Sequence, residues 1–265
     1  MLYCGVVVVN SPKNEKNICD KIMTRALFAL GRSKGVYQHN MSFYDSEIHK
    51  KEELENYMES HMVQALENNE FKLFLQPKIN LKNNPIDGAE ALVRWVTSEE
   101  NLISPTQFIP LFEKNGFCIR LDMYMVECVC KQLREWNDKG VTPIPISVNQ
   151  SKRLFYETDY VQNLSNLVAK YKIPCNLITL EILEGLAMEN VDQLNTKIVR
   201  LKKEGFRISM DDFGSGYSSL NILGHLKIDE LKLDRSFLLD ISSKRGLRQK
   251  TIMKEIVQLA KRLHI

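Results

Sequence analysis

The sequence contains no long hydrophobic run, no CxxC pair and no strong excess of charge of one sign. Its apolar start, residues 3–9, has no basic region before it and is far shorter than the roughly 18 residues that suggest a membrane span. We therefore predict a buried strand there and no membrane segment. The net charge of +3, with acidic residues interspersed, gives no argument for DNA or RNA as a partner.

The cysteines are few and follow no regular framework. There are six, and Cys128 and Cys130 would face different directions on a helix. We interpret all six as reduced thiols in the core or at its boundary, which is typical of a cytoplasmic protein.

The bulk composition is that of a globular protein. A chain of 265 residues, 44% hydrophobic and 26% charged, has room for one large domain and a small additional unit. A charged run at residues 46–57 predicts a solvated linking helix. Before it, the patterns predict a strand at residues 5–10, a helix at 17–33 and an extended piece at 36–44, which is too little for a domain.

After the linking helix, short β-rich runs alternate with longer helical stretches. Two predicted helices, residues 122–139 and 191–204, end at Gly140 and Gly205, where a left-handed C-cap is expected. Such alternation indicates a parallel sheet covered by helices. The predicted strands are residues 71–77, 89–95, 144–149, 177–183, 206–211 and 231–234.

Both an open doubly wound sheet and a closed (β/α) barrel fit this alternation. Barrel enzymes carry their active groups at the carboxyl ends of several strands, whereas an open sheet concentrates them at one crevice. Polar side chains fall within or at the ends of five separate runs, which favours the barrel. They are Glu90, Asn149, Glu181, Asp211 and Lys232.

The acidic and amide residues of this set, with Asp212, form an all-oxygen ligand set. Such ligands suit Mg²⁺ or Mn²⁺ better than Zn²⁺. Asp211 and Asp212 are adjacent, so inside a regular strand one of them would be buried on the wrong face. At a strand end both can turn toward one site.

Each of these residues also has a simpler interpretation. A single Asp or Glu at a strand end is usually a helix N-cap or a solvated rim residue, but coincidence on five strands favours a site. Lys232 lies in an alternating run and would point into the barrel with Asp234, beside an anionic site. The alternative is a lysine that extends to a polar rim.

Three further features lie in or near these strands. Arg94 shares the pleat direction of Glu90 and could contact a phosphate. Residues 214–216, Gly-Ser-Gly, are weak evidence for a phosphate cradle because no GK[ST] follows, and a mobile loop beside a metal site is the better interpretation. We expect Trp95 to pack in the core.

Together these segments resemble the EAL family. Residues 90–95, EALVRW, look like the EAL signature, and further matches run in family order from about residue 58 to the end. No single segment would be specific, but the series is. The others are FLQP (74–77), SVNQS (147–151), LEILE (180–184), DDFGSGYSSL (211–220) and LKLD (231–234).

The resemblance implies a TIM-like barrel whose first strand is antiparallel, and hydrolysis of cyclic di-GMP to linear pGpG. It implies Glu90 and Lys232 as catalytic residues, with Lys232 beside the attacking water. Two cations, Mg²⁺ or Mn²⁺, would activate the water and clamp the phosphate. The remaining roles are metal binding by Glu90, Asn149, Glu181, Asp211 and Asp212, substrate contact by Gln76, Arg94 and Asp234, and support of loop 213–220 by Glu184.

The chain departs from the family pattern at both ends. In the family, two more strands follow, one with a glutamate and one with a glutamine. The 265 residues of this sequence contain neither strand. The expected organisation is a small α+β remnant of a GGDEF-like domain without its signature (1–45), a linking helix (46–57) and an incomplete EAL domain (58–265). We expect the 265-residue chain alone to have little activity and poor stability, because a barrel without two strands has open edges.

A regulatory module that binds cyclic di-GMP without cleaving it is the alternative function. Degenerate relatives typically lose the EAL glutamate, an aspartate of the Asp-Asp pair or the lysine, and all of these are present here. The sequence therefore favours a catalytic domain. A homodimer through the barrel is a further hypothesis, and a scaffold that only dimerises would not need the polar set.

Overall fold

The chain is described by a computed structural model that covers residues 2–9, 18–35, 40–187, 190–214, 220–239 and 246–265. It divides into two compact units, Met1–Gln64 and Ala65–Ile265. Helix α2 (Ser46–Glu67) contains the boundary between the two units. Among the described residues, no helix is both long and apolar enough to cross a membrane.

The N-terminal unit is built from a parallel pair of short strands and a helix. Strand β1 (Cys4–Val6) pairs with β2 (Met41–Phe43), and α1 (Ile18–Gly35) connects them. A strand does form within residues 3–9, but its predicted burial is wrong, because Tyr3, Val8 and Val9 are 36%, 69% and 46% exposed. Among the described residues β1 has only β2 as a strand partner, so its flanking residues do not enter a sheet interior. The assignment of residues 1–45 to a GGDEF-like domain stays a prediction.

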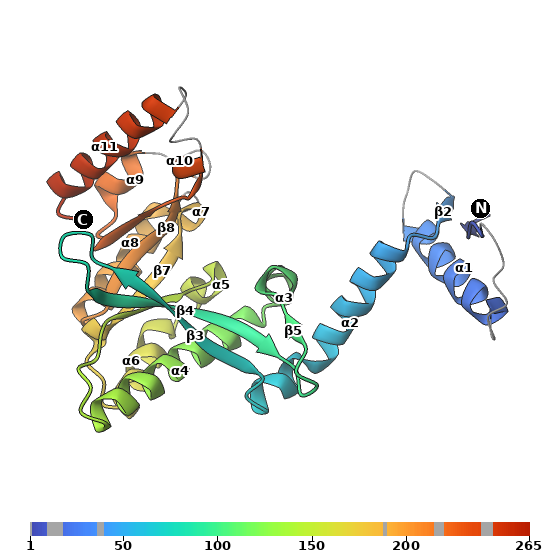
Figure 1. Ribbon diagram of the computed structural model, residues 1–265, viewed down its shortest axis with the longest axis horizontal. Coiled ribbons are helices and arrows are strands. Elements are labelled where there is room, and N and C mark those ends of the chain that lie inside the picture. Colours follow the sequence, from blue (N-terminus) through green and yellow to red (C-terminus); the bar gives the residue numbers. More distant parts are fainter. Residues whose placement is uncertain (1, 10–17, 36–39, 188–189, 215–219, 240–245) are drawn as a thin grey trace. The chain divides into compact units, whose positions relative to one another are not determined.

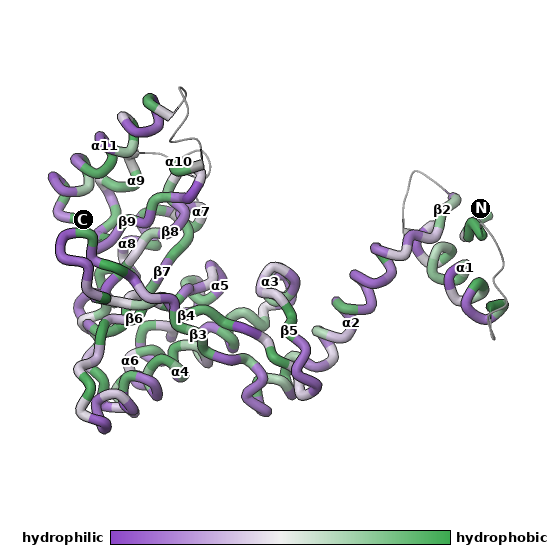
Figure 2. Tube along the Cα trace, viewed as in Figure 1, coloured by the Kyte–Doolittle hydropathy of each residue, from purple (hydrophilic) through white to green (hydrophobic). Residues whose placement is uncertain are grey.

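Helix α2 begins where the linking helix was expected and continues to Glu67. Asp45 caps its start, because the Asp45 carboxylate accepts hydrogen bonds from the backbone N–H groups of Glu47 (2.8 Å) and Ile48 (3.2 Å). The first turns of α2 are largely hydrophilic, as Figure 2 shows, which agrees with a solvated helix.

The second unit contains a seven-stranded sheet (Figure 1). The strand order is β3-β4-β6-β7-β8-β9, and β5 pairs with β4. Strand β3 is antiparallel to β4, as the resemblance implied, and the later neighbours along the order are parallel. The strands are β3 (Phe71–Ile79), β4 (Ile86–Val96), β5 (Leu102–Ile103), β6 (Ile146–Asn149), β7 (Ile178–Leu183), β8 (Arg207–Phe213) and β9 (Glu230–Leu233).

Helices follow most of these strands, as a βα alternation requires. Gly140 and Gly205 have positive φ values of 71° and 98° after α4 and α8, so the predicted left-handed helix ends are confirmed. The helices are α3 (Pro105–Asn115), α4 (Cys118–Asp138), α5 (Lys152–Tyr156), α6 (Tyr160–Lys170), α7 (Glu184–Ala187), α8 (Val191–Lys203), α9 (Leu220–His225), α10 (Ser236–Leu239) and α11 (Gly246–Arg262), with a 3₁₀ turn η1 (Cys175–Leu177).

The side chains of the parallel strands alternate between two environments. Apolar residues such as Ile146, Val148, Leu180 and Ile208 are fully or almost fully buried. They pack in the hydrophobic core with the helices, and Figure 2 shows β7 as largely hydrophobic. The intervening positions are polar and point to the opposite face of the sheet. Those polar positions are Ser147, Asn149, Thr179, Glu181, Ser209, Asp211, Glu230 and Lys232.

Period-two alternation thus collects the polar side chains on the face opposite the helices, which corresponds to the interior of a barrel. Within the described residues no strand pair joins β9 to β3, so the sheet is open there. The expectation of two further strands stays a prediction.

The cysteines are all free, as expected. Cys118 and Cys130 are buried, and Cys128 and Cys175 are intermediate. Cys4 and Cys19 are exposed, which corrects the interpretation of all six as core or boundary thiols. Both belong to the small N-terminal unit, which has few elements available to cover them.

Candidate metal centre

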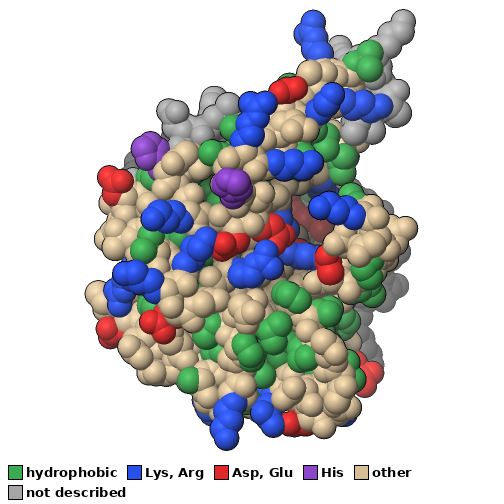
Figure 3. Space-filling model, turned by 90° about the vertical axis from the view of Figure 1, so that its left-hand side faces the viewer, with side chains coloured by type: hydrophobic (Ala, Val, Ile, Leu, Met, Phe, Trp, Pro, Cys, Tyr) green, Lys and Arg blue, Asp and Glu red, His purple; other side chains and the backbone are tan. Residues whose placement is uncertain are grey.

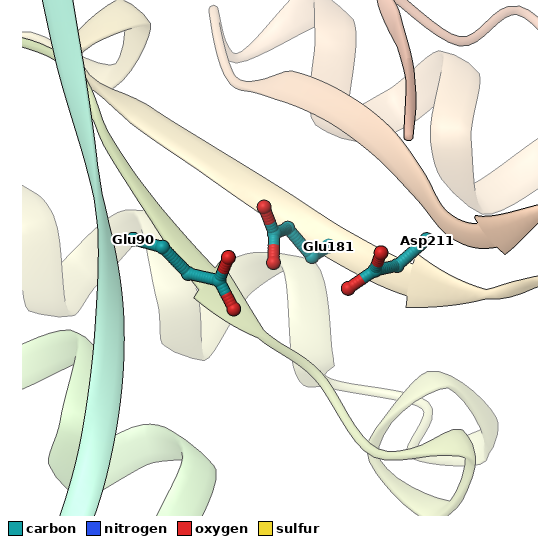
Figure 4. Close-up of side chains that lie close together, drawn as sticks. All are labelled: Glu90, Glu181 and Asp211. Carbon is teal, nitrogen blue, oxygen red and sulfur yellow. The ribbon is translucent and has the colours of Figure 1, made fainter. Parts of the chain in front are cut away.

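Three carboxylates from three different strands meet on the polar face of the sheet. Glu90 lies on β4, Glu181 on β7 and Asp211 on β8, and one carboxylate oxygen from each lies within 4.8 Å of the others. Figure 4 shows the three side chains directed toward one another. The side chain of Glu181 is fully buried, while those of Glu90 and Asp211 are 21% and 18% exposed. Three negative charges in a partly buried space require compensation by cations.

Lys232 of β9 supplies part of that compensation. Its Nζ lies 3.0 Å from Glu90 Oε2, 2.9 Å from Glu181 Oε2 and 2.7 Å from Asp211 Oδ2. Burial by itself lowers the pKa of Lys232, but the hydrogen bond to Asp211 and the charge of Glu181 outweigh it and raise that pKa above its ordinary value. The ammonium group therefore stays protonated, and Lys232 lies on the side of the sheet that alternation predicted.

Asn149 lies beside this group, at the end of β6. Its Nδ2 donates to Glu90 Oε1 over 3.4 Å, and it pairs in register with Glu181. The side-chain amide oxygen is thus near the carboxylates as an additional neutral oxygen donor.

Asp212 follows Asp211 in β8, but its side chain is exposed and is not one of the three clustered carboxylates. The predicted strand stops at residue 211, but β8 continues to Phe213, and its pairing with β9 shifts register between Met210 and Phe213. Asp212 has a φ of 56°, so the irregularity turns its side chain away from the position that a regular strand would impose. Burial, then the charges of Asp211 and Asp234, raise the pKa of Asp212.

The segment after β8 is anchored by Glu184, whose Oε2 accepts a 3.1 Å hydrogen bond from the Gly214 backbone N–H. Gly214 has a φ of 95°, a conformation that glycine adopts without strain. The mobile loop was predicted at residues that include 215–219, which lie outside the described residues.

The residues expected to contact substrate lie on β3 and β4 and directly after β9. Gln76 of β3 pairs in register with Glu90, and Asp234 follows β9 and accepts a 2.8 Å hydrogen bond from the Ser236 backbone N–H. The hydrogen bond from the Ser236 side chain, then that from the Ser236 backbone, and after these the backbone N–H and charge of Arg235, lower the pKa of Asp234. Arg94 donates to the carbonyl oxygen of Val93 over 2.8 Å.

A cavity of about 230 Å³ adjoins the cluster through Asn149, and Arg94 is among its lining residues. Most of the lining is apolar, including Leu92, Ile109 and Met125. Trp95 is fully buried and donates its indole N–H to Glu70 over 3.0 Å, which confirms its prediction as a core residue.

Two charged residues outside the predicted set adjoin the cluster, Lys78 through Glu181 and Glu230 through Lys78. Lys78 Nζ lies 3.2 Å from Glu181 Oε1 and 3.1 Å from Glu230 Oε1. Period-two spacing could have found both, because Lys78 lies two residues after Gln76 on β3, and Glu230 lies two residues before Lys232 on β9.

The donors therefore match a hard divalent cation. Carboxylate and amide oxygens are the ligands of such ions, and no imidazole or thiolate takes part in the group of acids described above. The four carboxylates of Glu90, Glu181, Asp211 and Glu230 also outnumber the ammonium groups of Lys232 and Lys78, which fits a dication.

A family model described as the EAL domain matches residues 60–265 of the sequence. The chain belongs to the EAL domain family. Its relatives include the signaling protein YkoW of Bacillus subtilis (strain 168), which is 34% identical over 239 residues. The cyclic di-GMP phosphodiesterase NbdA of Pseudomonas aeruginosa is 31% identical over 265 residues.

Solved EAL structures share the fold. The PaMucR phosphodiesterase, solved as a c-di-GMP complex, has a TM-score of 0.73 and 34% identity, and the match covers 79% of this chain and 84% of that one. The described sheet of this chain, mostly parallel and covered by helices, is therefore that of EAL domains, whose fold is a TIM-like barrel. The match to YkoW covers 90% of this chain and 30% of YkoW. The match to NbdA covers 100% of this chain and 34% of NbdA, so the chain spans only part of the length of these relatives.

Proposed function

We propose that this EAL domain hydrolyses cyclic di-GMP to linear pGpG in a reaction that depends on Mg²⁺ or Mn²⁺. The observation that carries the proposal is the convergence of Glu90, Glu181 and Asp211 around Lys232. Two relatives that are 31% and 32% identical to this chain have cyclic di-GMP phosphodiesterase in their names, which supports the same reaction here. Water would attack phosphorus, the bond to the 3′-oxygen would break, and a 5′-phosphate and a 3′-hydroxyl would result.

Glu90, Asn149, Glu181, Asp211 and Asp212 would hold the metal. A bound divalent ion supplies an activated water and neutralises charge on the phosphate. Lys232 would lie beside the attacking water in this proposal, because its Nζ contacts three of the candidate metal ligands. Its N–H groups would orient the attacking oxygen and stabilise the negative charge that develops on the phosphate.

The substrate residues in the proposal are Gln76, Arg94 and Asp234. Gln76 is placed beside Glu90 by the strand register, and Arg94 lines the cavity that adjoins Asn149, so the guanidinium could bind phosphate there. Glu184 would hold the start of the segment after β8 through Gly214. In this proposal the substrate would meet charged groups near the cluster and apolar surface in the adjacent cavity.

The N-terminal residues 1–45 are proposed to be the end of a GGDEF-like domain. The match to NbdA extends over the whole chain, which supports a shared organisation. A cytoplasmic location and a homodimer through the barrel belong to the same proposal.

The test is a turnover assay on the full-length protein with cyclic di-GMP and Mn²⁺, with linear dinucleotide measured by chromatography. We expect metal-dependent formation of pGpG that stops when a chelator is added. Binding of cyclic di-GMP without turnover would overturn the hydrolase and favour the regulatory module. Absence of both binding and turnover would contradict both functions.

A further inference from the structure

The fully buried Glu181 carboxylate is held from two sides. Its Oε2 faces Lys232 at 2.9 Å, within the carboxylate cluster. Its Oε1 faces Lys78 at 3.2 Å, and Lys78 is held in turn by Glu230 at 3.1 Å. The two oxygens of one candidate metal ligand therefore have separate cationic partners.

Lys78 and Glu230 lie between the cluster and a second, polar cavity. This cavity of about 520 Å³ is lined by both residues, with Ser147, Thr179, Arg207 and Asp229 among the others, whereas Glu181 is not in its lining. On the side of the molecule that lies at left in Figure 1, acidic and basic side chains lie next to one another around a hollow, as Figure 3 shows. Without Lys78, Glu181 Oε1 would face a space large enough for several waters.

We propose that Lys78, fixed by Glu230, is a positioning residue that keeps the Glu181 carboxylate turned toward the metal centre. The inference rests on the proposed function, because it assigns Glu181 to metal binding. Lys78 donates a hydrogen bond to Glu181 Oε1. The other oxygen, Oε2, is therefore directed to the side where Glu90 and Asp211 lie. Outer partners of this kind orient a metal ligand, and their loss typically lowers metal affinity or activity by about 10- to 100-fold.

A charge effect and a positioning effect of Lys78 have opposite signs. A lysine near a cation site repels the cation, so a purely electrostatic role predicts tighter metal binding when Lys78 is removed. A positioning role predicts weaker binding, because the freed carboxylate can rotate toward the cavity. The neighbouring Glu230 allows the two effects to be separated.

The decisive variant is the double substitution Lys78→Met with Glu230→Gln. It removes one positive and one negative charge, so the net charge of the site is unchanged while the support of Glu181 is lost. We expect Mn²⁺ affinity, measured on the full-length protein by electron paramagnetic resonance of free Mn²⁺, to fall by about 10-fold or more. The Mn²⁺ concentration for half-maximal activity should rise by the same factor, with a smaller change in kcat.

Two matched variants complete the experiment. Lys78→Arg retains a cation that can donate to Glu181 and should keep Mn²⁺ affinity within about 3-fold of the wild type. Lys82→Met removes an exposed lysine of the β3–β4 connection and should leave the affinity unchanged.

The possible outcomes separate the two proposals. Mn²⁺ affinity of the folded double variant within about twofold of the wild type, or tighter, overturns the role of Lys78. Loss of affinity in Lys82→Met to the same extent would also overturn it, because the effect would then not be specific to Lys78. If the wild type itself binds no Mn²⁺, the proposed metal-dependent function fails first.

Discussion

Buried or partly buried carboxylates occur in two neighbouring regions of the molecule, and their surroundings differ. In the cluster, Glu181 has two lysine partners, and Glu90 and Asp211 share one of them. In the adjoining cavity, Asp122 of α4 accepts a 2.7 Å hydrogen bond from the Ser151 backbone N–H, and its surroundings are largely apolar. Burial, partly offset by Ser151, raises the pKa of Asp122 to about 7.

The difference lies in the groups that face each carboxylate. Two cationic side chains lie within 3.3 Å of the Glu181 carboxylate in the cluster, whereas at Asp122 hydrogen bonding by Ser151 only partly offsets the cost of burial. The cluster is therefore suited to bind a cation, and Asp122 is suited to hold a proton near neutral pH. The following predictions test this contrast, from the largest expected effect to the smallest.

Removal of one cluster carboxylate should have the largest effect. We expect Glu90→Gln to lower kcat for cyclic di-GMP hydrolysis by roughly 1,000-fold, because the change removes a charged oxygen donor but no packing volume. Turnover of the full-length variant with Mn²⁺ measures the effect, and circular dichroism checks that the fold is retained. Wild-type turnover in this variant would refute the role of Glu90.

Removal of the shared cation should destabilise the fold. Lys232→Met leaves Glu90, Glu181 and Asp211 without their common ammonium partner, and breaking such a partly buried network costs about 3 kcal/mol. Urea unfolding of the variant and the wild type measures this loss. Because Mn²⁺ can replace the missing charge, added Mn²⁺ should stabilise the variant more than the wild type, and an equal response would argue against a cation site here.

Asp122 should make stability depend on pH in the opposite direction to a paired acid. The pKa of this carboxyl is 3.8 ordinarily and about 7 in the folded protein, so the folded state retains a proton that the unfolded chain has lost. The associated stabilisation is complete below pH 3.8 and is lost as the pH rises through about 7.

The variant Asp122→Asn should therefore lose this part of the pH dependence. Asparagine can still accept the Ser151 hydrogen bond but cannot ionise, so we expect a gain of about 2 kcal/mol relative to the wild type at about pH 8 and little gain at about pH 4. Urea unfolding at the two pH values measures it. Parallel pH profiles for the two proteins would show that Asp122 is not a protonated acid in the fold.

Glu184 should show the smallest effect. Glu184→Gln retains an oxygen that can accept from the Gly214 N–H but loses the charge, so we expect a loss of activity of only about 10-fold and a stability change of about 1 kcal/mol. Glu184→Ala should cost more in both assays. Equal activity in Glu184→Ala and the wild type would contradict the role of Glu184 in holding the segment after β8.

The sequence by itself determined the polar face of the sheet. Period-two alternation in short β-rich runs places Glu90, Glu181 and Lys232 opposite the apolar positions. Gly140 and Gly205 mark the ends of two helices. Both patterns can be found in the sequence because they depend on local backbone geometry. The same local patterns misjudged residues 3–9, where exposure depends on which elements lie nearby.

Only the tertiary structure decided which of these residues touch. Lys78 is 103 residues from Glu181 and 152 from Glu230 along the chain, and no local pattern relates them. The irregular backbone at Asp212 and the proton-holding environment of Asp122 also depend on strand pairing and on packing against distant segments. Side-chain types and spacings set which groups are available, and the folding of the sheet sets which charges they meet.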